Sequence, residues 1–392
     1  MKNISILGST GSIGVNALYV IGSTPSLFKV VAMSAGKNVS LLKEQIDKFR
    51  PKVVSVLNED GAYRLKEMLN SSSQVKILWG VDGYREVASV KEVDMVVSAI
   101  VGAAGLLPTM EAIDAGKNIA LANKETMVMA GSLVIEKAAS KGVAILPVDS
   151  EHNAIFQCLA GSRQEDIKRI ILTASGGPFL YLPLEELAEV KLADALKHPN
   201  WDMGKKITID SASMMNKGLE IIEAKWLFDV DIDKIDVHIH PQSIVHSMVE
   251  YIDGSVVAQL GVANMRGPIS YALSYPERLS REDHALNLFE VGPLEFIPPD
   301  FDKFPNLKLA YLAGRKGGTM PSVLNASNEV AVEAFIAEEI RFIDIPVVVR
   351  ETLFSHSQKE ISSIKDVLEA DRWARDKATE IIGKRLKVKG AR

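Results

Sequence analysis

The chain has 392 residues, of which 47% are hydrophobic and 24% charged, and its formal net charge is −5 at pH 7. This length allows two or three domains. The slightly acidic balance excludes the general attraction to nucleic acid that basic proteins show, and no apolar run is long enough to span a bilayer. The only cysteine, Cys158, excludes an internal disulfide and is interpreted as a buried thiol. The first apolar run starts almost at Met1, which leaves no room for a targeting peptide, so we expect a cytoplasmic bacterial protein.

Residues 1–149 alternate short β-rich runs with helical stretches. The helical stretches include Ser40–Phe49, Gly61–Leu69 and Leu133–Ala139. Strand, helix and strand at this spacing predict a Rossmann-like parallel sheet wrapped by helices. The apolar runs expected to form its strands are Ile4–Leu7, Val30–Met33, Val53–Val56, Met95–Ala99, Ile119–Ala122 and Ala144–Val148.

After residue 149 the pattern changes, because helices alternate with loops rich in Gly and Pro. Two β-like runs, Ile235–Ile239 and Val256–Leu260, predict a smaller sheet, and Ile297–Asp300 reads as a linker. We therefore expect an α/β chain with an N-terminal nucleotide domain (1–149), a central α+β domain (150–285), a linker (286–300) and a C-terminal helical domain (301–392). The helices expected in the last domain are Leu307–Gly314, Ala326–Glu339, Val347–Ser355 and Ile364–Gly383.

A glycine-rich segment, Gly8–Gly14, follows the first predicted strand and opens a predicted helix, Val15–Ile21. This is the context that a dinucleotide-binding loop requires, because glycines admit the pyrophosphate and a helix N-terminus supplies N–H groups. The spacing is Gly-x-x-Gly-x-x-Gly rather than the commoner Gly-x-Gly-x-x-Gly. A glycine-rich turn that binds no nucleotide is the alternative.

The residues after the second predicted strand indicate which nicotinamide cofactor binds. NAD-binding chains usually carry an acid there, whereas Ser34–Asn38 contains none and offers Lys37 to a 2′-phosphate. The sequence therefore favours NADP, with a solvated surface lysine as the alternative. Two further segments, Ala99–Gly102 and Leu121–Glu125, follow later strands, whose C-terminal ends face the ligand crevice in such sheets.

Carboxylates gather in two segments. Asp149 and Glu151 follow an apolar run, and along an extended strand end they would point the same way. Glu220 lies on a predicted helix, and Asn216 and Lys217 precede it by about one turn and share its face. Three carboxylates suit a hard divalent cation such as Mg²⁺ or Mn²⁺, while hydroxyl, amide and ammonium groups suit a phosphate.

The same helix has a plainer interpretation. Its apolar residues Leu219, Ile222 and Trp226 could form the buried stripe of a surface helix that carries a Lys–Glu pair. In either case Glu223 is interpreted as a solvated acid, because Asn216 and Lys217 point to Glu220 instead.

Three polar loops are candidate parts of a site. Thr173–Phe179 places hydroxyls beside glycines and predicts an anion-binding nest or a plain turn. His198–Lys205 carries a tryptophan, which predicts a lid over a substrate or a packed loop anchor. His240 and His246 lie near a predicted strand end, and one of them is expected to be structural.

Taken together, these segments resemble the 1-deoxy-D-xylulose 5-phosphate reductoisomerases over nearly the whole chain. The resemblance implies an N-terminal NADPH domain, a central catalytic and dimerising domain and a C-terminal helical bundle. It also implies a homodimer that converts 1-deoxy-D-xylulose 5-phosphate to 2-C-methyl-D-erythritol 4-phosphate with NADPH and Mg²⁺, Mn²⁺ or Co²⁺. The motifs are GSTGSIG, AIVGAAGL, LANKE, LPVDSEHNAIFQ, SGGPF, HPNW-x-MG, NKGLE, HPQSIVHSMV and LNASNE.

The resemblance assigns roles to residues of the catalytic centre. Asp149, Glu151 and Glu220 would ligate the metal, and Lys124 and Ser150 would contact the oxygen-bearing carbons of the substrate. Catalytic roles would fall to Lys124, Glu151, His198 and His246. The remaining substrate contacts, most of them to the phosphate, would be Ser175, His198, Trp201, Ser211, Asn216, Lys217 and Glu220.

The resemblance also assigns the flap and the cofactor site. Trp201 and Met203 would belong to the flap over the substrate. The residues that would bind NADPH are Gly8, Ser9, Thr10, Gly11, Ser12, Ile13, Gly36, Lys37, Asn38, Asn123, Glu125 and Gly204.

Two other functions are weighed against this one. A plain NADP-dependent sugar-phosphate or semialdehyde dehydrogenase accounts for the N-terminal loop but not for three carboxylates. A redox-sensing protein that holds NADP(H) without chemistry predicts a degraded central site, whereas this one is complete. The sequence leaves open whether the rearrangement is a retro-aldol cleavage with re-addition or a 1,2-shift.

Overall fold

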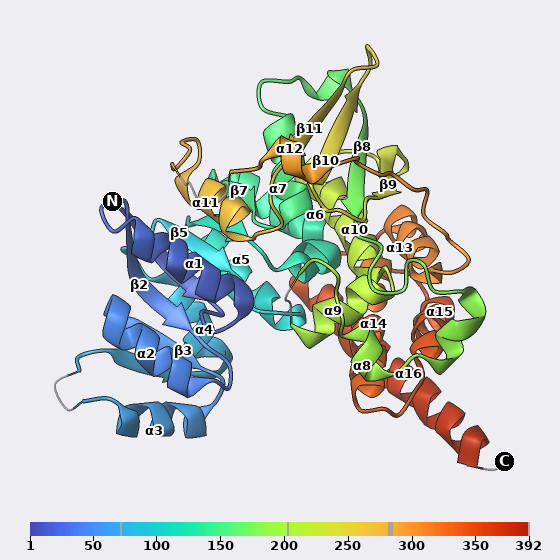
Figure 1. Ribbon diagram of the computed structural model, residues 1–392. Coiled ribbons are helices and arrows are strands. Elements are labelled where there is room, and N and C mark those ends of the chain that lie inside the picture. Colours follow the sequence, from blue (N-terminus) through green and yellow to red (C-terminus); the bar gives the residue numbers. More distant parts are fainter. Residues whose placement is uncertain (71–72, 202–203, 281–284, 391–392) are drawn as a thin grey trace. The chain divides into compact units, whose positions relative to one another are not determined.

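The computed structural model describes residues 1–70, 73–201, 204–280 and 285–390, which form two compact units (Figure 1). The first unit comprises Met1–Thr126, Val134–Asn153 and Asn264–Glu282, and the second comprises Met127–Leu133, Ala154–Ala263 and Asp283–Arg392. Two helices, α6 (Lys124–Lys141) and α7 (Ser150–Cys158), contribute residues to both units.

A seven-stranded parallel sheet forms the centre of the first unit, with strand order β4-β3-β2-β1-β5-β6-β7. Helices of this unit are α1 (Ser12–Ser23), α2 (Val39–Phe49), α3 (Glu59–Met68), α4 (Gly80–Ser89), α5 (Leu106–Asp114) and α11 (Arg266–Ser274). The strand order confirms the predicted Rossmann-like sheet. The strands are β1 (Lys2–Leu7), β2 (Phe28–Ser34), β3 (Val53–Val56), β4 (Lys76–Trp79), β5 (Met95–Ser98), β6 (Asn118–Leu121) and β7 (Ile145–Pro147).

One strand of this sheet, β4, was not predicted. It has four residues, lies at the sheet edge and leaves both Lys76 and Trp79 exposed. A strand this short and this exposed carries no buried apolar run by which it could be recognised. Each of the other six strands matches its predicted run to within two residues at each end, and only β1 and β2 differ by as much as two, at their starts.

The order in which the chain adds strands to the sheet reverses at β1. From β1 the chain builds outward through β2, β3 and β4, and then returns to add β5, β6 and β7 on the other side of β1. The carboxyl ends of β1 and β5 therefore lie side by side, and in open α/β sheets ligands bind at such a switch point. This position is where the predicted nucleotide loop begins.

Residues 264–282 belong to the first unit, although the predicted division places them in the central domain. Their helix α11 packs against α1: the Arg266 guanidinium lies 3.7 Å from the centre of the Tyr19 ring, and its Nε donates to Asn16 Oδ1 at 3.1 Å. Lys2 Nζ also donates to the carbonyl oxygen of Leu273 at 3.0 Å. Contacts rather than chain order decide this grouping, and the four-part domain division stays a prediction.

A four-stranded mixed sheet of order β11-β10-β8-β9 lies in the second unit. Its strands are β8 (Ile167–Ala174), β9 (Ile235–Ile239), β10 (Val245–Tyr251) and β11 (Val256–Leu260), of which β8 and β9 are parallel. The two predicted runs are confirmed as β9 and β11. Strand β10 lacks a continuous apolar run, because three of its buried side chains are polar: His246, Ser247 and Glu250.

Helices complete the second unit. The predicted C-terminal helices are confirmed as α13, α14, α15 and α16, and α10 packs against α13 in the largest core. The helices are α8 (Leu192–Ala195), α9 (Lys205–Ala212), α10 (Met215–Leu227), α12 (Leu288–Val291), α13 (Pro305–Lys316), α14 (Met320–Ile336), α15 (Ile345–Ser355) and α16 (Ile364–Gly390).

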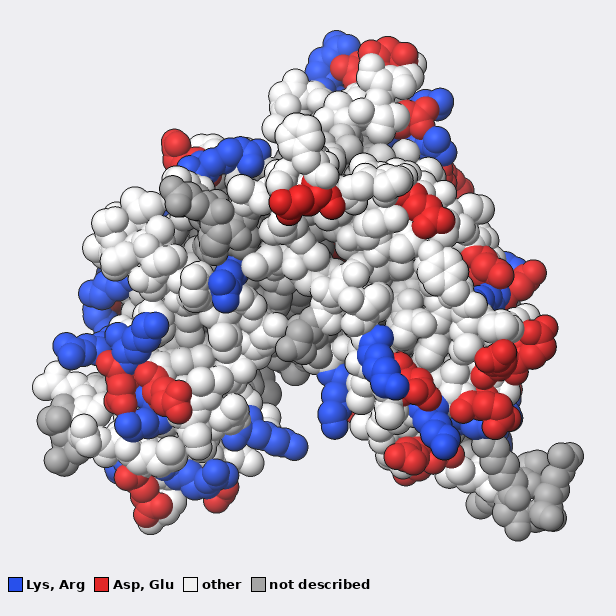
Figure 2. Space-filling model, in the orientation of Figure 1, with Lys and Arg blue, Asp and Glu red and all other residues white. Residues whose placement is uncertain are grey.

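Charges of both signs are intermixed on the face of the molecule drawn in Figure 2. This face has no broad surface of one sign, which agrees with the small net charge of −5. Among the described residues, no helix combines the length and the apolar character needed to cross a bilayer.

Candidate active site

The nucleotide loop follows β1 and is shaped by two glycines. Gly8 has φ +86°, and a Cβ there would lie 2.6 Å from the carbonyl oxygen of Ala99, which follows β5. At Gly14 a Cβ would lie 2.3 Å from the carbonyl oxygen of Gly8. Both positions exclude a side chain, so the loop folds tightly over the start of α1. Helix α1 begins at Ser12 with Gly11 as its N-cap, which leaves its first N–H groups without a side-chain cap, as anion binding requires.

The predicted cofactor residues of this loop are not equivalent. Ser9 is fully buried, its Oγ donates to Gln45 Oε1 at 2.7 Å, and its backbone N–H donates to the carbonyl oxygen of Ser34 at 2.7 Å. Ser9 therefore anchors the loop to β2 and α2 through these two hydrogen bonds. Gly11 and Ser12 are exposed and Thr10 and Ile13 half-buried, so these four can reach a ligand.

The segment after β2 presents Gly36, Lys37 and Asn38 to solvent. Asn38 Oδ1 accepts the Leu41 N–H at 3.1 Å and so caps α2. Lys37 is exposed immediately before this cap, and no acidic side chain stands between β2 and α2. The structure thus presents an exposed cation after β2, and its contact with a 2′-phosphate stays a prediction.

Asn123 and Glu125 follow β6 and are both buried. Asn123 Nδ2 donates to the carbonyl oxygens of Ile100 (2.6 Å) and Gly102 (3.0 Å), and its Oδ1 accepts the Thr126 N–H (3.0 Å) at the start of α6. The Asn123 amide therefore fixes the loop after β5 beside α6. Its predicted contact with NADPH is untested.

The carboxylates of the first unit lie at the start of α7. The expectation that Asp149 and Glu151 extend a strand is wrong, because β7 ends at Pro147 and Glu151 belongs to the first helical turn. Asp149 caps this turn: its Oδ1 accepts the Ser150 N–H at 3.0 Å. Lys124 Nζ lies 2.6 Å from Asp149 Oδ2, and Ser150 Oγ donates to Glu151 Oε2 at 2.6 Å.

The third predicted metal ligand, Glu220, lies on α10 in the second unit and is 0% exposed. Asn216 Nδ2 donates to Glu220 Oε1 at 2.5 Å, and the Lys217 ammonium pairs with Glu220 Oε2. The predicted common face of these three residues is therefore confirmed.

The interpretation of Glu223 as a solvated acid is wrong, since it is only 1% exposed. Residues 217–224 of α10 are all buried, so the helix has no solvated side there, and it packs against β8, β9 and α13 of the same unit. An apolar stripe on one face of a helix does not reveal that its other faces are also covered, as they are here over residues 217–224.

Two serines and a histidine predicted to bind phosphate come together in the second unit. His198 Nε2 lies 3.1 Å from Ser175 Oγ and 3.1 Å from Ser211 Oγ. Its Nδ1 accepts the N–H groups of Asn200 (3.2 Å) and Trp201 (3.0 Å). In neutral imidazole the proton is then on Nε2, which donates toward the two hydroxyl oxygens. Both serine hydroxyl protons can therefore be directed at a further acceptor such as a phosphate oxygen.

Backbone geometry makes the close approach of Ser175 and Ser211 possible. Gly177 has φ +66°, and a Cβ there would lie 2.9 Å from the carbonyl oxygen of Ser211. A larger residue would push the Ser175–Gly177 segment away from α9. The segment, predicted to be an anion nest or a plain turn, thus packs directly against Ser211, and its binding of an anion stays a prediction.

The two histidines of the HPQSIVH motif differ. His240 is buried, its Nε2 accepts the N–H groups of Ile244 and Val245 (both 3.1 Å), and its Nδ1 donates to the carbonyl oxygen of Glu295 (2.8 Å). His240 is therefore the structural histidine. His246 is buried on β10, and its ring centre lies 6.4 Å from that of Trp201.

The structure describes residues 198–201 and 204–205 of the predicted flap. Asn200, which the sequence analysis did not single out, donates through Nδ2 to the carbonyl oxygen of Pro241 (2.7 Å) and to Ser243 Oγ (2.8 Å), which anchors the start of the flap. Gly204 is the N-cap of α9. Met203 lies outside the described residues.

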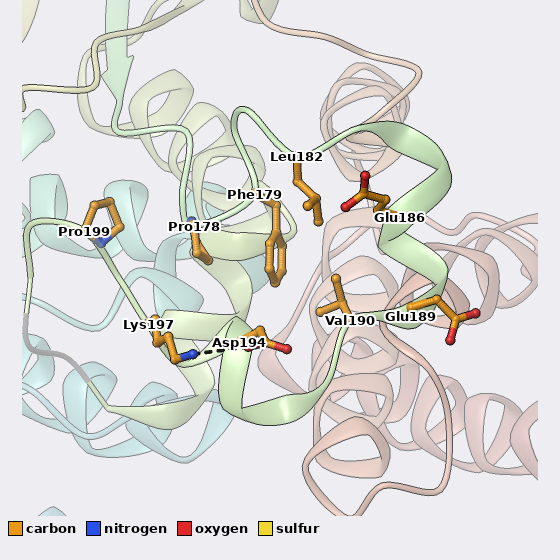
Figure 3. A pocket seen from close by; sticks show the side chains of 9 residues that line it. All are labelled: Pro178, Phe179, Leu182, Glu186, Glu189, Val190, Asp194, Lys197 and Pro199. Atoms are coloured by element: carbon orange, nitrogen blue, oxygen red, sulfur yellow. Dashed lines mark hydrogen bonds and ion pairs between the residues drawn. The ribbon is translucent and has the colours of Figure 1, made fainter.

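A separate cavity of about 570 Å³ opens in the second unit (Figure 3). None of the predicted site residues lines it, although Pro178 and Pro199 are sequence neighbours of the Ser175 and His198 segments. Its charged rim includes an ion pair between Lys197 and Asp194 (3.2 Å), and its remaining lining residues are Phe179, Leu182, Glu186, Glu189 and Val190.

Family models match three stretches of the chain. The model of 1-deoxy-D-xylulose 5-phosphate reductoisomerase matches residues 4–131, that of its C-terminal domain matches residues 145–228, and that of the DXP reductoisomerase C-terminal domain matches residues 260–377. The reductoisomerase of Geotalea daltonii is 55% identical over 97% of this chain and 99% of its own length. That of Chlorobaculum tepidum is 56% identical over 98% of this chain and 100% of its own length.

Solved structures agree with these matches. The Zymomonas mobilis reductoisomerase in complex with NADPH has a TM-score of 0.91 and 41% identity over 97% of this chain and 99% of its own. A DOX-P reductoisomerase in complex with NADPH, fosmidomycin and magnesium has a TM-score of 0.93 and 44% identity over 98% of both chains. The chain therefore belongs to the 1-deoxy-D-xylulose 5-phosphate reductoisomerase family.

Proposed function

We propose that this protein carries out the reaction of its family at the residues described above. It is an NADPH- and divalent-metal-dependent enzyme that rearranges and reduces 1-deoxy-D-xylulose 5-phosphate to 2-C-methyl-D-erythritol 4-phosphate. The observation that best supports the assignment of residues is the convergence of Ser175 and Ser211 on His198. The direct test is oxidation of NADPH by the purified protein with this substrate and Mg²⁺ or Mn²⁺. Turnover that survives removal of divalent cations would favour a plain NADP-dependent dehydrogenase.

Three carboxylates are proposed as metal ligands: Asp149 and Glu151 of the first unit and Glu220 of the second. Their oxygen atoms are the donors that Mg²⁺ and Mn²⁺ prefer. A carboxylate buried as completely as Glu220 stays ionised only beside cations, and Lys217 supplies one. When bound, the divalent cation would act as a Lewis acid that polarises the substrate oxygens.

Other residues near these carboxylates would orient and balance them. The Lys124 ammonium holds Asp149, and the Ser150 hydroxyl holds Glu151. From these positions Lys124 and Ser150 are proposed to contact the oxygen-bearing carbons of the substrate. Both a retro-aldol route and a 1,2-shift need charge stabilised on those oxygens, so the same residues serve either.

The phosphate of the substrate is proposed to bind Ser175, His198, Ser211, Asn216 and Lys217. Hydroxyl and amide groups donate hydrogen bonds, and the Lys217 ammonium supplies positive charge. The phosphate is remote from the reacting carbons, so its binding energy can drive closure of the flap that carries Trp201. Closure would place Trp201, whose ring lies beside that of His246, over the substrate and exclude water from the reactive aldehyde.

The cofactor site is proposed at the loop after β1 and the segment after β2. We expect the unmodified enzyme to prefer NADPH over NADH, because exposed Lys37 faces the position of the 2′-phosphate. Lys37→Asp should erode this preference by charge repulsion. The measurement is kcat/KM with each cofactor. Lys52, an exposed lysine of the same unit, provides the matched control, and Lys52→Asp should leave the preference unchanged. Equal turnover of both cofactors by the unmodified enzyme would refute this assignment.

The quaternary structure is proposed to be a two-fold symmetric homodimer. Strand β11 pairs with β10 on one side only and exposes Val256 (50%), Val257 (43%) and Leu260 (36%). An apolar edge strand of this kind is normally covered, and a second copy would cover it symmetrically. We expect a dimeric mass by light scattering at micromolar concentration, and a monomeric mass would refute the proposal. The cytoplasmic location stays a prediction.

A further inference from the structure

The helices after residue 301 hold the segment that is proposed to bind the substrate phosphate. This segment, the phosphate turn (residues 210–217), joins α9 to α10 and carries Ser211, Asn216 and Lys217. Met214 adopts φ +59° and its N–H donates to the carbonyl oxygen of Ser211 at 3.1 Å. A left-handed residue other than glycine is costly, so the surrounding structure must hold it in place.

A buried asparagine of α14 provides one such contact. Asn328 is fully buried, and its Nδ2 donates to Asp210 Oδ1 at 2.7 Å. The other carboxylate oxygen, Asp210 Oδ2, lies 3.0 Å from Lys206 Nζ. A second asparagine, Asn306 of α13, donates to the carbonyl oxygen of Ser213 at 3.3 Å. The phosphate turn is thus held from two helices of the same unit.

Stability alone gives no reason for this arrangement. Asp210 lies in the last turn of α9, where the helix dipole disfavours a negative charge. Burying a carboxylate also costs free energy, and apolar residues of similar size are often as stable as a buried ion pair. The hydrogen bond from Asn328 instead fixes the orientation of the Asp210 side chain. Successive helix residues differ by about 100° around the axis, so fixing Asp210 against α14 also fixes where Ser211 points.

We propose that Asn328 and Asp210 are positioning residues for the substrate phosphate. They act through Ser211 and the turn that follows it, and neither touches the substrate. The inference rests on the proposed phosphate site. It assigns a role in substrate recognition to Asn328 of the LNASNE motif, which none of the catalytic groups described above accounts for.

The test substitutes Asn328→Leu, which keeps the branched shape and the number of side-chain heavy atoms and removes the donor. We expect the KM for 1-deoxy-D-xylulose 5-phosphate and the inhibition constant of inorganic phosphate to rise about tenfold, as loss of a hydrogen bond to a charged group can cause. The kcat at saturating substrate and the affinity for NADPH should change much less. A purely structural role would lower the fraction of folded enzyme and so lower kcat, without raising either phosphate-dependent constant.

Asn325→Leu is the matched control. Asn325 is fully buried on the same helix, one turn earlier, and its Nδ2 donates to Glu329 Oε1 at 3.2 Å rather than to the phosphate turn. It should lower the melting temperature without raising the KM or the phosphate inhibition constant. Asp210→Asn should keep most of the affinity for the substrate, because the amide carbonyl oxygen can still accept from Asn328. A substitution of Asp210 that leaves no acceptor should lose that affinity.

The outcomes separate the two proposals. If the unmodified protein does not oxidise NADPH with this substrate and a divalent cation, the proposed function fails. If it does, and Asn328→Leu leaves both phosphate-dependent constants unchanged or Asn325→Leu raises them equally, the positioning role is refuted. Should Asn328→Leu not fold, Asn328→Ser keeps a polar group in the buried position yet is too short to reach Asp210, and the same constants decide.

Discussion

Glu220→Gln is expected to remove most of the turnover and to raise the metal concentration needed for half-maximal activity. The substitution keeps the size of the side chain but replaces a charged oxygen ligand with an amide, whose NH₂ group would face one of the two donors, the Asn216 amide or the Lys217 ammonium. Loss of an outer contact to a metal ligand already costs roughly ten- to a hundredfold, so loss of the ligand itself should cost at least that. Turnover measured across a Mg²⁺ or Mn²⁺ titration gives both quantities.

NADPH affinity, followed by fluorescence, should be nearly unchanged in Glu220→Gln, because the nucleotide loop belongs to the other unit. Glu223 cannot serve as the control, since it is buried one turn further along α10. Asp229→Asn is the better control: Asp229 is exposed just after α10, and its left-handed φ of +48° suits asparagine. If Glu220→Gln retains near-normal activity at low metal, or if Asp229→Asn is equally damaging, the ligand assignment is wrong.

Gly14→Ala is expected to destabilise the first unit and to weaken NADPH binding at least about tenfold. Alanine normally stabilises a helix relative to glycine. At this position, however, the added Cβ would lie 2.3 Å from the carbonyl oxygen of Gly8 and 2.5 Å from Ser9 Cα, and neither backbone atom can move without opening the loop. Forcing such a contact typically costs about 1–3 kcal/mol of unfolding free energy. Chemical denaturation and NADPH titration measure the two effects.

The control for this prediction is the same substitution in the same helix. Gly22 is exposed in the last turn of α1, and a Cβ there would lie no closer than 3.6 Å to the Phe49 ring. Gly22→Ala should therefore be neutral or stabilise by about 0.5–1 kcal/mol and leave NADPH affinity intact. Equal damage from both substitutions would show that the helix tolerates no added side chain, and that the tight loop is not the cause.

Local patterns in the sequence predicted most of the strands and the chemistry of the site. Buried parallel strands are continuous apolar runs, so six of the seven strands were recognisable, whereas the exposed edge strand β4 was not. The shared face of Asn216, Lys217 and Glu220 followed from helical spacing alone, because residues three and four apart are neighbours on any α-helix. Asp149 and Glu151 were predicted to belong to one site, but in an extended rather than a helical backbone conformation. The same residues are compatible with a strand end and with a helix start.

Properties that depend on elements distant in sequence could be seen only in the folded chain. Glu223 is buried although helical spacing allows it a solvated position, and nothing within the helix encodes the neighbours that cover it. The side chains of Asn123 and Ser9 form hydrogen bonds within the fold. Their partners, Gly102 and Gln45, come from other loops and helices. The role inferred for Asn328 rests on a hydrogen bond to a residue 118 positions earlier in the chain. The chemical groups of the site and their local spacing can be read from the order of residues, because backbone periodicity is a short-range property. Burial and hydrogen-bond partners were decided by packing, which brings distant segments into contact.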